Sequence, residues 1–112
     1  MAKQIADSIK GGGRHVFLLY GEMGAGKTTL VSQVMKLHNK KIHVQSPTFA
    51  IINQYTDNIF HIDLYRIENP EYLENLNLRE ILEGENIVFI EWPCRLSDEL
   101  LEVAKPYKEV LL

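Results

Sequence analysis

The chain has 112 residues, 46% of them hydrophobic and 24% charged, and a formal net charge of -3, which predicts one small domain covering residues 1–112. The negative charge argues against strong nucleic-acid binding without a partner, because phosphate contact requires clustered lysines and arginines. The single cysteine, Cys94, excludes an internal disulfide, and we see neither a membrane span of roughly 18 apolar residues nor a secretory signal, so we expect a cytoplasmic protein without a membrane partner.

The first predicted elements are a helix and a strand separated by glycines. Ile5, Ala6 and Ile9 fall on one face of a helix from residue 2 to residue 10. The three glycines at 11–13 predict the end of that helix and a flexible turn. The apolar run from His15 to Tyr20 then predicts a strand.

Residues 21–28 read G-E-M-G-A-G-K-T and fit the phosphate-loop pattern G-x-x-x-x-G-K-[ST]. The pattern is informative here because it lies between the predicted strand and a predicted helix from Lys27 to about Asn39. Glycines allow successive N–H groups to converge on phosphate oxygens, and the helix offers its positive N-terminal end to the same anion. We expect Lys27 to reach the β- and γ-phosphates and the Thr28 hydroxyl to ligate Mg²⁺.

The predicted nucleotide-binding residues are Glu22, Met23, Gly24, Ala25, Gly26, Lys27, Thr28 and Thr29. Nothing in the loop itself distinguishes ATP from GTP. The sequence contains no N-K-x-D-like motif of the kind that reads guanine. We therefore expect ATP and Mg²⁺ as cofactors.

Three segments rich in β-branched and aromatic residues follow, at 42–45, 49–55 and 59–65. The last two predict a hairpin that turns at Asp57 and Asn58. Thr48 lies in the loop between the first two segments. Its hydroxyl either senses the γ-phosphate or joins the Mg²⁺ shell, as in a switch segment, or it belongs to a plain turn.

The later predicted elements are helices at 69–76, 77–83 and 97–105 and strands at 87–91 and 110–112. Asn69 followed by Pro70 is typical of a helix start. The apolar run at 87–90 predicts a strand covered on both faces. Together the elements predict an α/β fold, a P-loop NTPase-like three-layer sandwich with a mostly parallel central sheet plus an antiparallel hairpin.

Hydrolysis also needs an acidic group beside the metal and a group that places the water. Two predicted strands end in a carboxylate, Glu91 and Asp63. The run before Glu91 is the more uniformly apolar, so we expect a central strand beside the loop strand and assign Glu91 to the metal with Thr28. Asp63 then orients water or makes an outer contact, or it is a surface carboxylate paired with Arg66. We interpret His61, two residues earlier on the same strand face, as a structural or capping histidine.

Four segments, at 21–29, 46–49, 61–66 and 90–93, carry the blocks GEMGAGKTT, SPTF, HIDLYR and IEWP. In this order they resemble the TsaE (YjeE) family, the P-loop ATPase of bacterial tRNA threonylcarbamoyladenosine (t6A) synthesis. The resemblance runs from about Ile5 to Pro93. It implies an ATPase that acts with the TsaB and TsaD subunits and reaches tRNA indirectly, through that complex.

The resemblance also implies roles for single residues. It makes Lys27 and Thr28 the phosphate and Mg²⁺ residues and Glu91 the second metal-side residue. It places Thr48 in a switch-like loop and Asp63 in ATP turnover. Trp92 belongs to the last block, where we expect it only to pack near the site, and Glu22 stands where the family commonly has Asp.

Two other functions fit the sequence. The first is a nucleotide-occupied assembly module in which the bound state, rather than hydrolysis, promotes assembly. The second is a small-molecule kinase, which shares the loop and the Mg²⁺ chemistry. Such kinases usually close an arginine-bearing lid, and beyond the loop this chain has only Arg66, Arg79 and Arg95 and no obvious lid insert.

Overall fold

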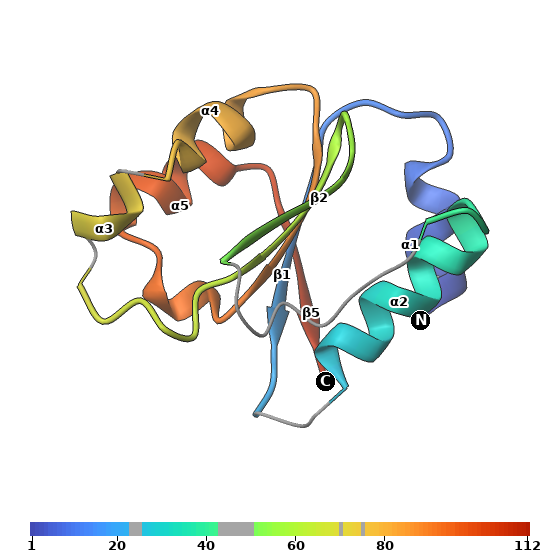
Figure 1. Cartoon of the computed structure of the whole chain (residues 1–112), viewed down its shortest axis with the longest axis horizontal. Helices are drawn as coiled ribbons and strands as arrows, with labels where there is room; N and C mark the ends of the chain where they lie inside the picture. The colour runs from blue at the N-terminus through green and yellow to red at the C-terminus, as the bar shows by residue number, and fades with distance from the viewer. Residues whose placement is uncertain (23–25, 43–50, 70, 75) are drawn as a thin grey trace.

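In the computed structural model, which describes residues 1–22, 26–42, 51–69, 71–74 and 76–112, a five-stranded sheet lies between two helical layers (Figure 1). One layer holds α1 (Ala2–Ile9) and α2 (Lys27–His38). The other holds α3 (Glu71–Glu74), α4 (Leu78–Glu83) and α5 (Asp98–Ala104). The expected three-layer sandwich is confirmed.

The strands are β1 (His15–Tyr20), β2 (Ile52–Thr56), β3 (Ile59–Asp63), β4 (Ile87–Glu91) and β5 (Lys108–Leu111). Their order in the sheet is β2-β3-β4-β1-β5. β1 runs parallel to β4 and β5, β4 runs parallel to β3, and β2 pairs with β3 as an antiparallel hairpin. The predicted sheet is therefore confirmed, and β4 is the central strand beside β1, as its continuous apolar run indicates.

The core divides by the two faces of the sheet, because successive strand residues point to opposite sides. On β1, Val16 and Leu18 belong to the cluster under α3, α4 and α5, while Phe17 and Leu19 belong to the cluster under α1 and α2. Phe89 of β4 stacks on Phe17 with ring centroids 5.2 Å apart. The alternation that buries Phe89 also turns Glu91 toward the α2 side.

The helical region after residue 69 differs from the prediction. Asn69 Oδ1 accepts a hydrogen bond from the Glu71 N–H at 3.0 Å, as expected of a residue that caps a helix start. The helix ends early, however, and Asn77 makes no side-chain cap to α4. Asn77 has a φ of 57°, a left-handed conformation that asparagine tolerates. Asn77 therefore occupies the N-cap position of α4, as predicted, but without the side-chain bond that such a cap usually makes.

Smaller differences concern the ends of elements. β3 stops at Asp63 rather than residue 65, where the Tyr65 N–H bonds to the Asp63 side chain instead of to a neighbouring strand. A short 3₁₀ helix, η1 (Pro93–Arg95), was not predicted. Most of the strand expected at 42–45 lies outside the described residues. Within the described part of the chain, none of the helices has the length and apolar character needed to cross a membrane.

Candidate functional site

The phosphate loop leads from the end of β1 into the first turn of α2. Gly26, the residue before the helix, has a φ of 91°, which favours glycine over any residue with a Cβ. A Cβ built there meets nothing within 4 Å, so the space beside it is open. The first turn of α2 carries no acidic residue and no side-chain cap. The N–H groups of a helix start are donors to which an anion can bind.

Lys27, the first residue of α2, is turned inward and is only 5% exposed. Its ammonium nitrogen Nζ donates a hydrogen bond to the Gly21 carbonyl at 2.8 Å. The same nitrogen lies 4.4 Å from the centroid of the Trp92 ring, within the range of a cation–π interaction. The Trp92 ring also packs against the Tyr65 ring, with their centroids 5.1 Å apart. The Gly21 carbonyl and the Trp92 ring are both uncharged, so neither contact pairs the Lys27 ammonium with an anion.

Glu91 and Thr28 join the end of β4 to the first turn of α2. The Thr28 hydroxyl Oγ1 donates a hydrogen bond to Glu91 Oε2 at 3.2 Å. Glu91 is 4% exposed although it is a carboxylate. A buried acidic side chain requires compensating partners, and the hydroxyl predicted to ligate Mg²⁺ is one of them.

His61 is the second partner of that carboxylate. Its ring nitrogen Nε2 lies 2.5 Å from Glu91 Oε2, and the side chain is fully buried. The other ring nitrogen, Nδ1, lies 2.7 Å from the Tyr55 hydroxyl. Burial and the nearby Glu91 charge raise the pKa of Tyr55 well above its ordinary value, so the phenol keeps its proton. Side chains from β2, β3, β4 and α2 thus form one hydrogen-bonded chain.

Asp63 stands directly across from Glu91 in the parallel pairing of β3 and β4. Its Oδ1 accepts a hydrogen bond from the Tyr65 N–H at 3.0 Å. Burial raises the pKa of Asp63 above its ordinary value; the Tyr65 hydrogen bond opposes this effect, and the Glu91 charge adds to it. Asp63 is half-buried beside the metal-side carboxylate, a different environment from that of a solvated surface group.

A family model described as "Threonylcarbamoyl adenosine biosynthesis protein TsaE" matches residues 1–110 of this chain. The chain belongs to the TsaE family. A TsaE protein from Nostoc sp. is 46% identical over 88 residues, which cover 72% of this chain and 54% of that relative. One from Aquifex aeolicus is 39% identical over 114 residues, covering 92% of this chain and 76% of that relative.

A solved structure supports the fold. The crystal structure of YdiB from Bacillus subtilis matches with a TM-score of 0.61 and 26% identity, covering 98% of this chain and 68% of YdiB. The chain spans about half the length of the Nostoc relative and of a TsaE protein from Rickettsia felis. The similarity therefore covers the P-loop NTPase-like fold and the segment that carries the four TsaE blocks.

The structure brings together several of the residues predicted from those blocks. Lys27, Thr28 and Glu91 meet at the start of α2, with Asp63 in register on the next strand. Thr29 and Glu22 are exposed beside them. The remaining predicted site residues, Met23, Gly24, Ala25 and Thr48, lie outside the described residues.

Sequence reasoning missed part of this TsaE site. It gave Tyr55 no role, treated His61 as structural and expected Trp92 only to pack nearby. The one available signal was alternation, since His61 and Asp63 share a strand face and the face of Phe89 continues to Glu91. No sequence pattern indicated that the ring of Trp92, the N-cap residue of η1, would lie against Lys27.

The residues at the start of α2 fit Mg²⁺. Thr28 and Glu91 supply a hydroxyl and a carboxylate, the hard oxygen donors that this ion prefers. In the part of the chain that the structure describes, no three His, Cys, Asp or Glu residues are placed to hold a metal. The site therefore suits an ion that takes its remaining ligands from nucleotide phosphates and water, as Mg²⁺ does in phosphate-binding enzymes.

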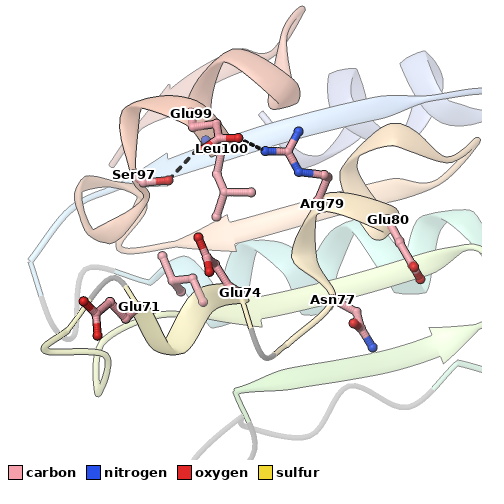
Figure 2. A pocket seen from close by; sticks show the side chains of 9 residues that line it. Glu71, Glu74, Asn77, Arg79, Glu80, Ser97, Glu99 and Leu100 are labelled. Atoms are coloured by element: carbon pink, nitrogen blue, oxygen red, sulfur yellow. Dashed lines mark hydrogen bonds and ion pairs between the residues drawn. The ribbon is translucent and has the colours of Figure 1, made fainter.

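A separate cavity of about 540 Å³ lies in the other helical layer, on the opposite side of the sheet (Figure 2). Figure 2 shows Arg79 of α4 reaching to Glu99 of α5 across it. Its lining residues are Glu71, Leu73, Glu74, Asn77, Arg79, Glu80, Ser97, Glu99 and Leu100. Four carboxylates against one guanidinium disfavour a phosphate in this cavity.

Proposed function

We propose that this chain binds Mg²⁺ and ATP and hydrolyses the nucleotide as an accessory subunit in tRNA t6A modification, acting with TsaB and TsaD. Membership of the TsaE family supports the pathway. The hydrogen bond between Thr28 and Glu91 is the observation that carries the chemistry. It connects the helix after the phosphate loop to a buried carboxylate at the end of β4, the pair that P-loop NTPases use at their metal.

In this proposal Lys27 exchanges the Gly21 carbonyl for the β- and γ-phosphates. The start of α2 and the loop N–H groups hold the same phosphates. Thr28 and Glu91 would hold Mg²⁺. The bound ion would neutralise the charge that develops on the phosphoryl oxygens. Asp63, next to Glu91, orients the attacking water. Catalysis then consists of positioning and charge stabilisation, as expected for phosphoryl transfer.

The kinase interpretation is weakened by where two arginines lie. Arg79 forms ion pairs with Glu99 and Glu83, and Arg95 donates to the Ile67 carbonyl at 3.2 Å. Both side chains are used in structural contacts rather than extended from a lid. A cytoplasmic location is part of the proposal and agrees with a sequence whose single cysteine cannot form an internal disulfide.

ATP hydrolysis by the purified chain, with and without Mg²⁺ and then with TsaB, TsaD and tRNA, tests the proposal. We expect turnover that requires Mg²⁺, responds to the partners and is lost in Lys27→Ala. ATP binding without turnover in every mixture would instead support the assembly-module function. Absence of ATP binding would refute both. Phosphorylation of a metabolite above background hydrolysis would favour the kinase.

A further inference from the structure

Glu91 is held by a relay of side chains that begins on the edge strand. β2 lies at the edge of the sheet, and the order β2-β3-β4 places Tyr55, His61 and Glu91 on three successive strands. Each member bonds to the next, at 2.7 Å and 2.5 Å. Thr28 of α2 closes the chain on the same oxygen, Glu91 Oε2. The side chain that presents the predicted metal ligand is therefore fixed from two directions.

The hydrogen-bond chemistry gives the relay a direction. A carboxylate only accepts hydrogen bonds, so the ring nitrogen of His61 that faces it, Nε2, must carry the proton. In a neutral imidazole the other nitrogen, Nδ1, is then an acceptor and needs a donor. The Tyr55 hydroxyl supplies it, and the raised pKa of Tyr55 keeps that donor protonated. Glu91 and Tyr55 thus favour the same tautomer, in which His61 donates to Glu91 and accepts from Tyr55.

The pairing of β2 with β3 is irregular at Tyr55. The pairing of β2 and β3 shifts between Gln54 and Thr56, which leaves Tyr55 as the extra residue of a β-bulge. Such bulges re-aim a side chain at the cost of local ladder bonds and are frequent beside active sites. Without the shift Tyr55 would stand opposite Ile59. The bulge thus lies at the residue whose hydroxyl bonds to His61.

Oε2 of Glu91 already accepts from both His61 and Thr28, which uses its two lone pairs. These two donors thus hold the carboxylate that would bind Mg²⁺, directly or through water. We infer that Tyr55 and His61 are positioning residues that fix the Glu91 carboxylate for Mg²⁺ binding at the nucleotide site. This inference rests on the proposed function, which it deepens by adding the residues behind the metal ligand.

The first test needs no nucleotide. The ¹⁵N chemical shifts of the His61 ring report which nitrogen carries the proton. We expect the Nε2–H tautomer in the wild-type protein and, in Tyr55→Phe, a shift of the Nδ1 resonance that marks the loss of its hydrogen-bond donor. An Nδ1–H ring in the wild-type protein would overturn the inference, whether or not the chain hydrolyses ATP.

The second test measures Mg²⁺ affinity directly. Trp92 is the single tryptophan and lies against Lys27, so its fluorescence reports on the nucleotide site. With nucleotide bound, Tyr55→Phe and His61→Leu should weaken Mg²⁺ binding by about 10- to 100-fold, the usual effect of losing an outer partner of a metal ligand. Nucleotide affinity in chelator should stay at the wild-type value. His61→Gln, which keeps an N–H donor, should recover part of the Mg²⁺ affinity that His61→Leu loses.

The control is Tyr72→Phe, which removes a hydroxyl from an exposed residue of α3. Circular dichroism and thermal melting verify that each variant is folded. Mg²⁺ affinity unchanged in Tyr55→Phe and His61→Leu, or lost equally with Mg²⁺-free nucleotide affinity, would overturn the positioning role. Mg²⁺ affinity and nucleotide affinity are both binding measurements. They therefore decide the inference even if the wild-type chain binds Mg²⁺ and ATP without hydrolysing the ATP.

Discussion

Replacing Glu91 in two different ways separates its part in folding from its part in chemistry. Glu91→Ala removes the acceptor of both His61 and Thr28. Thr28 is half-buried and its hydroxyl can turn to water, but His61 is fully buried. An orphaned buried donor costs about 1–3 kcal/mol, so we expect the free energy of unfolding to fall by about that amount. For a domain of this size each kcal/mol lowers the melting temperature by roughly 4 °C.

Glu91→Gln keeps an amide oxygen that accepts from His61, and we expect its stability to stay within about 1 kcal/mol of wild type. It removes the charge that the metal requires. Both variants should therefore lose Mg²⁺-dependent hydrolysis by at least about 100-fold, or roughly 2.7 kcal/mol in the barrier. Thermal melts and ATPase rates with the Lys27→Ala control measure the two effects. Equal melting temperatures for the two variants, or retained turnover in Glu91→Gln, would refute the reasoning.

Three further predictions concern stability. Burial raises the folded-state pKa of Asp63, so the wild-type protein loses stability as pH rises from the unfolded-state pKa to the folded-state pKa of this group. In urea unfolding, Asp63→Asn should be more stable than wild type at about pH 7 and should lose this advantage near pH 3. A stability difference that does not depend on pH would contradict this. Phe89→Ala, which removes a buried ring stacked on Phe17, should cost about 3–5 kcal/mol in denaturant unfolding, and a cost below about 1 kcal/mol would contradict the core assignment. Glu99→Gln breaks an exposed ion pair with Arg79 and should change the same free energy by less than about 1 kcal/mol, so a larger loss would be unexpected.

The fold was predictable because its signals are local. The apolar runs at 15–20 and 87–90 marked the two central strands, and the loop between the first strand and α2 fixed the phosphate end of the sheet. Parallel strands end at the same edge, which is why Glu91 could be assigned to that edge from sequence. The prediction was weaker for α3 and α4, where Asn77 stands at the N-cap of α4 in a left-handed conformation and makes no side-chain cap.

The rest of the site depends on contacts between distant segments. Tyr55 reaches His61 across the pairing of β2 with β3, and no periodic pattern within one strand identifies a partner on the next. His61 and Trp92 were visible in the family blocks, but their partners were not. A histidine on an apolar face is ordinarily structural. Only the pairing of β3 with β4 reveals that His61 Nε2 lies 2.5 Å from Glu91 Oε2.

Under the proposed function, the metal-binding and phosphate-binding halves of the site differ in how far they are already assembled. The metal side is assembled, because Thr28 and Glu91 are already bonded and Glu91 is held from behind. The phosphate side is not, because the Lys27 ammonium is engaged by the Gly21 carbonyl and the Trp92 ring. A neutral carbonyl and an aromatic face bind an ammonium more weakly than phosphate oxygens do. These contacts therefore keep the lysine ordered and partly desolvated near the loop, yet they yield to an arriving anion. Under the proposed function, nucleotide binding requires a rearrangement of Lys27 but none of the carboxylate that receives Mg²⁺.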